Sequence, residues 1–411
     1  MCDMNINIVL VHNAYGKISG EEIAVENLAT LLEKRGAVVH RFSRSSVEIE
    51  DGLPGKMAAF FSGIHNPFTK RDFEKFLKDK RPDVVHVHNL YPLISPSILP
   101  VCKALGVPVV MTVHNFRLVC PNGLLMSKGK ICHRCLGGRE YWCVLRNCEY
   151  NISKSTGYAL RTVVARMLRC YLDNVSHFIC LSEFQKNILV TEGLPADRVS
   201  VMANPLSLAK SQKTENNNTG SPTGTFGDDI AGGCPTGTLG HDKGVGGGYV
   251  AYVGRISPEK DVFTLLAAAR SLGDIPFKFA GDYHRMPEVL KNKPDNCEFL
   301  AQLNAQDIAS FYANARMVVF ATRCYEGFPS VLLEAMSHSL PIICSRIGGL
   351  PEIVADYVNG FLYESGNATE LGERIRLLWQ NPELCEKFGV AGLQKLAVKY
   401  SPDRLMDRLL G

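Results

Sequence analysis

The sequence predicts an α/β protein of two domains, each built on a parallel β-sheet. The 411 residues exceed the ~250 to 300 residues at which a single hydrophobic core stops growing. Short β-rich runs alternate with helix-like stretches in both halves of the chain, and this alternation is typical of parallel sheets covered on both faces. A polar, glycine-rich segment separates the two halves.

The first half opens with a strand–helix–strand pattern. Ile6 to Val11 form an apolar run typical of a strand, and Glu21 to Arg35 carries apolar residues at helical spacing. Gly36 is a typical helix end, and Val38 opens the next strand. Further strands are expected at Val84 to His88, Val107 to Val113, Ser176 to Cys180 and Val199 to Ala203. We expect residues 1–205 to form the N-terminal domain.

The segment 206–248 differs in composition from the rest of the chain. From Lys210 onward it consists mainly of Gly, Thr, Asn, Asp and Ser, and such a segment buries too little apolar surface to offset its ordering entropy. We expect it to be a disordered, low-complexity linker insertion. After it, strands are expected at Tyr249 to Val253, Phe277 to Ala280, Glu298 to Leu300, Met317 to Ala321 and Pro341 to Cys344. Residues 249–400 should form the second domain.

Composition and charge exclude several classes of protein. Hydrophobic residues make up 46% and charged residues 21% of the chain, as in globular proteins. The net charge, 45 − 41 = +4, is too weak to indicate a nucleic-acid partner. The chain shows neither an uninterrupted apolar run of spanning length nor a secretory signal pattern, so we expect a cytoplasmic protein.

Two glutamates separated by seven residues follow the strand expected at Met317 to Ala321. Glu326 lies in the turn before a helix, and Glu334 lies inside that helix, roughly 12 Å further along at helical rise. The turn also carries Gly327, Phe328 and Ser330. Their free amides beside the positive end of the helix dipole would form an anion site. Taken alone, the two carboxylates also fit an ordinary structural interpretation, in which one is a surface glutamate of the helix and the other caps it.

A second motif, Val253 to Asp261, also comes directly after an expected strand. It contains Arg255 and Lys260, which could converge on one anion. Arginine binds phosphate in a bidentate way, and lysine acts as a mobile point charge. The alternative is that both are ordinary solvated cations of a loop.

Together the two motifs resemble the C-terminal domain of the GT-B retaining glycosyltransferases of family 4. In that domain a strand is followed by a G-R-x-x-x-E-K-type loop and later by an E-x7-E motif. The resemblance covers nearly the whole chain and extends to Ala280 to Asp282, Gly348 to Glu352 and Asn359 to Leu362. In the first half it rests on Val87 to Asn89, Thr112 to Asn115, Leu181 to Phe184 and Val201 to Pro205.

The resemblance implies two Rossmann-like domains whose parallel sheets face a central cleft. The domain of residues 1–205 would take the acceptor, and the domain of residues 249–400 would bind a nucleotide sugar. The last helix, within residues 401–411, would pack back toward the N-terminal domain.

The resemblance also implies a role for each motif residue. Glu326 and the amides of Gly327, Phe328 and Ser330 would hold the transferred sugar, and Glu334 would hold the ribose. Arg255 and Lys260 would neutralise the diphosphate leaving group, and His114 would contact the donor sugar. Ser19 and Gly20 would approach the diphosphate through the backbone, where this chain departs from the usual pair of glycines. The implied catalytic residues are thus Glu326, His114, Lys260 and Arg255.

The expected reaction is transfer of a sugar to a glycan or a lipid-linked acceptor with retention of anomeric configuration, in cell-surface polysaccharide synthesis. A UDP-sugar is the favoured co-substrate. Because two cations and a helix N-terminus can neutralise the leaving group, we expect neither a catalytic metal nor another cofactor. Two alternatives stay open: a nucleotide-sugar epimerase of the same architecture, and a non-catalytic sugar-binding protein.

Five cysteines cluster in a glycine-rich stretch between residues 120 and 148: Cys120, Cys132, Cys135, Cys143 and Cys148. The last four have a spacing tolerable for a structural zinc site. Reduced packing and a disulfide are the other two interpretations.

Two basic amphipathic stretches, Thr69 to Arg81 and Tyr158 to Leu172, complete the set of motifs. In the second, Arg161, Arg166 and Arg169 are expected opposite Val164, Leu168 and Leu172. Each stretch fits an ordinary solvated helix face over a core. Each also fits peripheral contact with an anionic membrane that carries a lipid-linked acceptor.

Overall fold

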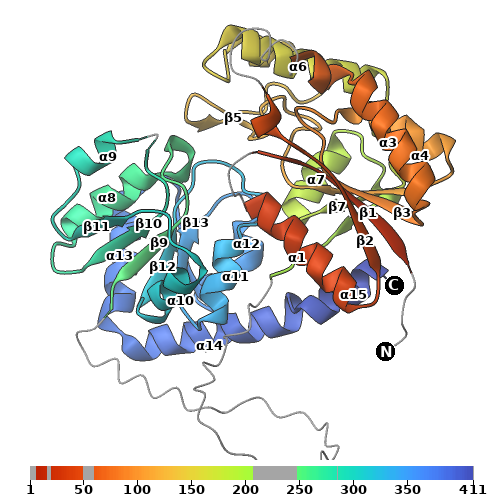
Figure 1. Cartoon of the computed structure of the whole chain (residues 1–411). Coiled ribbons are helices and arrows are strands. Elements are labelled where there is room, and N and C mark those ends of the chain that lie inside the picture. The colour runs from red at the N-terminus through yellow and green to blue at the C-terminus, as the bar shows by residue number, and fades with distance from the viewer. Residues whose placement is uncertain (1–5, 16–19, 50–59, 207–247, 285, 411) are drawn as a thin grey trace, which may run out of the picture.

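Two six-stranded parallel sheets form the two halves of the protein in the computed structural model (Figure 1). The structure describes residues 6–15, 20–49, 60–206, 248–284 and 286–410. The expected α/β class with two parallel sheets is confirmed. The expected linker insertion lies almost wholly outside the described residues, and the exact domain limits stay a prediction.

The first sheet has the strand order β2-β1-β3-β4-β7-β8. Its strands are β1 (Asn7–Ala14), β2 (Val38–Ser45), β3 (Val84–Asn89), β4 (Val109–Val113), β7 (His177–Cys180) and β8 (Val199–Val201). Its helices are α1 (Gly20–Lys34), α3 (Pro67–Lys80), α4 (Leu99–Ala104), α5 (Tyr141–Leu145), α6 (Ile152–Met167) and α7 (Glu183–Thr191). A small antiparallel pair, β5 (Met126–Ser127) and β6 (Lys130–Ile131), lies outside the sheet.

Alternate residues of β1 enter two different cores. Ile8 and Leu10 pack with Leu28 and Leu32 of α1, whereas Val9 and Val11 pack in the cluster that contains Phe73 and Leu77 of α3. Successive side chains of a strand point to opposite faces of its sheet. The apolar run predicted as a strand is therefore buried on both sides, as expected for a parallel sheet.

The second sheet has the strand order β11-β10-β9-β12-β13-β14, which is the 3-2-1-4-5-6 order of dinucleotide-binding sheets. Its strands are β9 (Val250–Val253), β10 (Phe277–Ala280), β11 (Cys297–Leu300), β12 (Met317–Phe320), β13 (Ile342–Ser345) and β14 (Gly360–Tyr363). Its helices are α8 (Val262–Ser271), α9 (Glu288–Lys291), α10 (Ala305–Ala313), α11 (Ser330–Ser337), α12 (Leu350–Ile353) and α13 (Ala368–Gln380).

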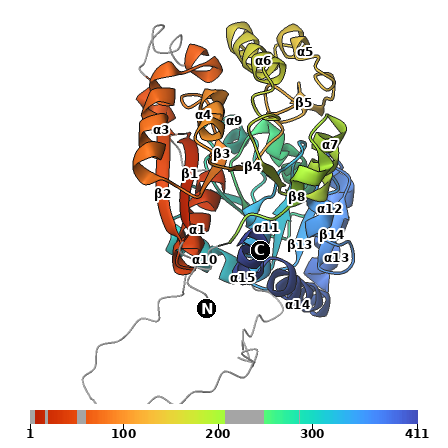
Figure 2. The same cartoon turned by 90° about the vertical axis from the view of Figure 1, so that its right-hand side faces the viewer.

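Two C-terminal helices link the second sheet to the first. α14 (Pro382–Lys399) packs on α11, and α15 (Pro402–Leu410) lies beside α1 in both views (Figures 1 and 2). Met406 enters the α1 core. The guanidinium of Arg35 pairs with Asp403 at 2.9 Å and with Asp407 at 3.0 Å. The end of the chain thus contacts the N-terminal half.

The loops that follow the strands of the two sheets meet each other directly. A Cβ atom placed on Gly327, after β12, would lie 2.5 Å from the carbonyl oxygen of His114, which follows β4. The carboxylate of Glu352 accepts the amides of Glu183 and Phe184 at the N-terminus of α7, at 2.9 and 2.7 Å. Ligands of such sheets bind at the carboxyl ends of the strands, so this contact region is where a site is expected.

Among the residues that the structure describes, no helix combines the length and the apolar character needed to cross a membrane.

Candidate functional site

A partly buried ion pair joins the two motifs of the second sheet. Nζ of Lys260 lies 2.7 Å from Oε1 of Glu326, and the two side chains are only 17% and 15% exposed. The hydroxyl of Thr322 donates to the same carboxylate oxygen at 2.8 Å. The loop after β9 and the loop after β12 therefore meet, as their positions after neighbouring strands of one sheet require.

Both members of this pair are held in their charged forms. Burial alone would lower the pKa of Lys260, but the charge of Glu326, the neighbouring Cys324 and the hydrogen bond to Glu326 together outweigh it, and the pKa is raised. Burial alone would raise the pKa of Glu326, but the charge of Lys260 and the hydrogen bonds from Lys260 and Thr322 bring it below its ordinary value. The site thus presents a fixed cation next to a fixed anion.

Arg255 lies close to this pair but is more exposed. Its guanidinium donates to Oε1 of Glu259 at 2.8 Å, and its side chain is 52% exposed. The repulsion between Arg255 and Lys260 contributes to the pKa of Lys260, so the two cations act on the same region. Glu259 in turn is tied to the loop after β12, because its carbonyl accepts the amide of Arg323 at 2.8 Å.

The N-terminus of α11 follows Glu326 immediately. Its N-cap residue is Pro329, which provides no side-chain cap, so the first amides of the helix keep their partial positive charge for another acceptor. Ser330 is the first helical residue. Phe328 is buried against the ring of Tyr400, so only its backbone can take part in a site.

Glu334 lies one turn into α11, where its Oε2 accepts a hydrogen bond from the hydroxyl of Tyr312 at 2.9 Å. The side chain is half-buried. As the spacing predicted, Glu326 lies in the turn before α11 and Glu334 lies within the helix. Each carboxylate has a hydrogen-bond partner within the protein.

His114 ends a stack of histidines from the first sheet. Its Nε2 lies 2.9 Å from Nδ1 of His88, and His88 stacks on His86 with ring centroids 4.4 Å apart. Burial lowers the pKa of His114 to about 3, so the ring is neutral at physiological pH. Its carbonyl oxygen contacts Gly327, so the backbone of His114 lies beside the turn that carries Glu326.

Ser19 and Gly20 were predicted to approach the diphosphate through their backbone. Of these two residues the structure describes Gly20, which begins α1. Its surroundings are open, since a Cβ atom there would meet no atom within 4 Å. Ser19 lies outside the described residues.

A polar group that the sequence motifs did not reveal surrounds the start of α1. The hydroxyl of Tyr15 donates to Oε2 of Glu21 at 3.3 Å and accepts from Arg117 at 2.8 Å. Nδ1 of His12 lies 3.7 Å from Oε1 of Glu21. The group combines residues about 100 positions apart, so no local spacing could have identified it.

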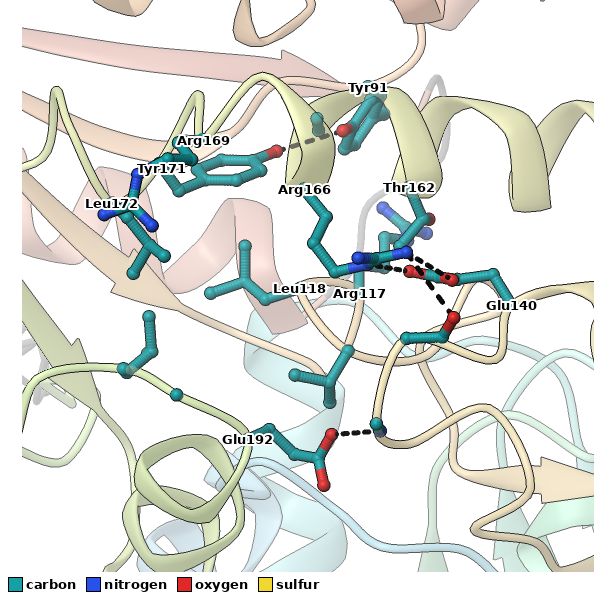
Figure 3. A pocket seen from close by; sticks show the side chains of 16 residues that line it. Tyr91, Arg117, Leu118, Glu140, Thr162, Arg166, Arg169, Tyr171, Leu172 and Glu192 are labelled. Carbon is teal, nitrogen blue, oxygen red and sulfur yellow. Dashed lines mark hydrogen bonds and ion pairs between the residues drawn. The ribbon is translucent and has the colours of Figure 1, made fainter.

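A cavity of about 220 Å³ lies in the N-terminal half beside α6 and the end of α7 (Figure 3). Arg166 and Glu140 form an ion pair at its wall, with Nε 2.7 Å from Oε1. The hydroxyls of Tyr91 and Tyr171 lie 3.0 Å apart on another wall. Neither Lys260 nor any other residue of the second half lines this cavity.

The expected zinc site at Cys132, Cys135, Cys143 and Cys148 is not supported. Cys135 hydrogen-bonds to Cys120, which lies outside the expected four, and Cys143 hydrogen-bonds to Cys148. Cys132 directly follows the β5–β6 hairpin, and its backbone amide donates to the carbonyl of Leu125 at 2.7 Å. Within the described part of the chain, no three His, Cys, Asp or Glu side chains are arranged to hold a metal ion. The donor set therefore does not fit zinc, and the five cysteines are free thiols.

The orientation expected for α6 is wrong at Arg161. Its guanidinium is buried between the rings of Tyr158 and Tyr91, 3.7 and 4.3 Å from their centroids, because a flat cation can stack on aromatic faces in the core. Leu168, expected on the opposite, inward face, is exposed. In α3, by contrast, Phe73 and Leu77 are buried as an ordinary helix face.

The arrangement at the second sheet suits a ligand that carries a diphosphate between two hydroxylated groups. Lys260, Arg255 and the uncapped amides of α11 supply positive charge, and Glu326 before α11 and Glu334 within it supply hydrogen-bond acceptors. Helix N-termini and paired cations of this kind are common phosphate sites.

Two family models match the chain. The model described as Glycosyltransferase Family 4 matches residues 18–210, and the model described as Glycosyl transferases group 1 matches residues 241–395. The two matches together cover both sheets and the site.

Individual relatives agree with these models. An uncharacterised glycosyltransferase of Methanocaldococcus jannaschii is 36% identical over 154 residues, which are 36% of this chain and 43% of that protein. The capsular polysaccharide biosynthesis glycosyltransferase CapM of Staphylococcus aureus is 26% identical over 168 residues, 39% of this chain and 44% of its own length. These alignments thus span less than half of either curated relative.

The fold has close parallels among solved structures. HepE of Anabaena, in complex with UDP and glucose, superposes with a TM-score of 0.62 at 16% identity, over 98% of each chain. The chain belongs to glycosyltransferase family 4 and has the GT-B fold that its motifs indicated.

Proposed function

We propose that this protein transfers a sugar from a nucleotide-diphosphate sugar, with a UDP-sugar as the favoured donor, to a hydroxyl group of a glycan or lipid-linked acceptor. The observation that carries the proposal is the Lys260–Glu326 ion pair beside the uncapped N-terminus of α11. The complex of HepE with UDP and glucose supports the choice of donor. The name of CapM supports a role in polysaccharide synthesis.

In this proposal the positive groups bind the diphosphate. Lys260 and Arg255 neutralise its charge together with the amides of Gly327, Phe328 and Ser330, which makes the nucleotide diphosphate a good leaving group without a metal ion. The carboxylate of Lys260's partner, Glu326, then accepts hydrogen bonds from the sugar hydroxyls. Glu334, further along α11, accepts hydrogen bonds from the ribose.

We propose retention of anomeric configuration, with the acceptor attacking on the face from which the diphosphate leaves. The contact between Gly327 and the His114 carbonyl supports a reaction in a closed arrangement of the two halves, since closure excludes water from the reacting groups. Neutral His114 contacts the donor sugar, and the backbone at Ser19 and Gly20 approaches the diphosphate.

We also propose peripheral contact of a cytoplasmic protein with an anionic membrane through α5 and α6. Large apolar side chains of this region are 53% to 79% exposed: Tyr141, Leu145, Tyr150, Ile152, Met167 and Leu168. Lys154 and Arg169 accompany them with half or more of their side chains exposed. Such a combination of apolar and basic groups suits a membrane surface. Flotation with anionic and neutral liposomes tests this, and equal behaviour with both would reject it.

The proposed activity is tested by nucleotide-sugar binding followed by product analysis. UDP-, GDP-, ADP- and dTDP-sugars are screened for protection against thermal unfolding, because a ligand of the folded state raises its stability. The stabilising donor is then incubated with glycan and lipid-linked acceptors. A glycosylated product with retained configuration supports the proposal. Protection by none of the four donor classes, or conversion of the donor into an epimer without transfer, contradicts it.

A further inference from the structure

The polar group at the start of α1 lies at the same edge of the first sheet as the histidine stack. His12 is near the end of β1, Glu21 is in the first turn of α1, and Arg117 follows β4. His12 is close enough to His114 for its charge to act on the pKa of that ring. Since the His114 carbonyl contacts Gly327, the group faces the region where Glu326 and Lys260 lie.

Within the described part of the chain, several buried polar atoms of this group find no hydrogen-bond partner. They are Oε1 of Glu21, both ring nitrogens of His12 and Nε of Arg117. His12 is 6% exposed and the Glu21 side chain 11%. A buried polar atom without a partner costs free energy, and native structures rarely leave one in that state unless another molecule satisfies it. The cluster therefore has hydrogen-bonding capacity left for a further partner.

The spacing of these atoms indicates what that partner is. Nδ1 of His12 and Oε1 of Glu21 are 3.7 Å apart, too far for a hydrogen bond between them. A hydroxyl oxygen that lies to one side of this pair and contacts both atoms can donate its proton to the carboxylate and accept from the imidazole, because a hydroxyl carries one donor and two acceptor positions. The gap thus suits an alcohol.

We propose that Glu21 and His12 bind and orient the acceptor hydroxyl group that attacks the donor sugar. The inference rests on the proposed transferase function and adds to it the residues that hold the second substrate. Tyr15 and Arg117 act as positioning residues, because the hydrogen bonds from Arg117 to Tyr15 and from Tyr15 to Glu21 fix the carboxylate.

Acceptor binding by this carboxylate depends on pH. Burial raises the pKa of Glu21 to about 7, against the opposing effects of Arg117 and Tyr15, and Glu22 raises it further. Burial lowers the pKa of His12 below its ordinary value, although Glu22 and Glu26 oppose this, so His12 stays neutral in the same range. The ionised carboxylate of Glu21 only accepts hydrogen bonds, whereas the protonated carboxyl group also donates one. Because the acceptor hydroxyl needs an acceptor for its proton, turnover should rise as the pH passes through about 7.

The test uses UDP-glucose with water as the attacking hydroxyl, and UDP as the binding probe. Glu21→Gln is compared with Glu33→Gln, which makes the same charge change at an exposed site on the same helix. We expect Glu21→Gln to lower the rate of UDP release from UDP-glucose at least tenfold and to abolish its rise near pH 7. Its dissociation constant for UDP and its melting temperature should not deteriorate. Glu33→Gln should behave like the wild type.

Three outcomes would overturn the inference, and they are distinguishable. Unchanged turnover and pH profile in Glu21→Gln would show that Glu21 does not meet the attacking hydroxyl. A parallel loss of UDP affinity and thermal stability would assign Glu21 a structural role. Failure of the wild-type protein to bind UDP or to release it from UDP-glucose would reject this donor, and the inference with it.

Discussion

Glu326 and Lys260 hold each other at 2.7 Å, and Thr322 fixes the same carboxylate oxygen at 2.8 Å. In the proposed reaction the lysine meets the diphosphate and the glutamate meets the sugar. The two roles are therefore coupled before any donor binds: each charge keeps the other ionised and oriented. The contribution of Lys260 and Glu326 to stability can be separated from their contribution to sugar transfer only in a variant in which both residues are changed.

Neutralising only one member of this pair should destabilise the protein. In Lys260→Gln the largely buried carboxylate of Glu326 loses its counter-charge, which costs roughly 3 kcal/mol of unfolding free energy. The double variant Lys260→Gln/Glu326→Gln replaces the ion pair by two amides and should recover most of that loss in urea denaturation. Neither variant should transfer sugar. A stable double variant with wild-type turnover would contradict the assignment of both residues.

Gly327→Ala should impair turnover more than donor binding. The new Cβ atom would lie 2.5 Å from the carbonyl oxygen of His114, so the two loops would have to separate. We expect kcat to fall at least tenfold while the dissociation constant for UDP, measured by calorimetry, changes by less than threefold. Gly273→Ala is the control, because a Cβ atom there meets nothing within 4 Å. Equal kinetics in the two variants would argue against a role for this contact.

Glu334→Gln should weaken nucleotide binding. If the carboxylate accepts the ribose hydroxyls, its loss removes charge-assisted hydrogen bonds that contribute about 1.5 to 3 kcal/mol, a factor of roughly 10 to 100 in affinity for UDP. Tyr312→Phe removes only the hydroxyl that donates to Glu334 at 2.9 Å and should change the affinity for UDP only a few-fold. Calorimetric titration of UDP into both variants measures this, and unaltered binding by Glu334→Gln would refute the ribose role.

The pH dependence of stability should change in Glu21→Gln. The pKa of Glu21 is about 7 in the folded protein and about 4.3 in an unfolded chain. The folded state therefore binds the proton more tightly, and wild-type stability falls as the pH rises through the window from 4.3 to 7. The difference amounts to roughly 4 kcal/mol. Relative to the wild type, Glu21→Gln should gain stability between pH 4.5 and pH 8 in urea denaturation, and parallel curves would disprove the raised pKa.

Much of the fold followed from local patterns in the sequence. The apolar runs at Ile6 to Val11 and Tyr249 to Val253 correspond to β1 and β9 within three residues at each end, because strands buried on both faces leave a continuous apolar signal. Glu326 and Lys260, 66 positions apart, were both assigned to loops after strands. Their contact followed from the order of those strands in one sheet.

What the sequence could not predict depends on contacts between distant segments. Arg161 looked like a solvated cation, but aromatic rings from β3's following loop and from α6 itself enclose it. The thiol of Cys135 hydrogen-bonds to that of Cys120, which is 15 positions away in the sequence, and not to that of Cys132, which is three positions away. The hydrogen bond from Arg117 to Tyr15 crosses 102 positions. None of these contacts leaves a periodic or spaced pattern, so only the folded arrangement reveals them.

The most direct test of the account is a crystal structure of the protein in complex with UDP. We predict that the diphosphate lies within hydrogen-bond distance of Nζ of Lys260 and of the amides at the N-terminus of α11, with the ribose at Glu334. A nucleotide bound elsewhere, for example in the cavity beside α6, with the Lys260–Glu326 pair untouched, would contradict the proposed site.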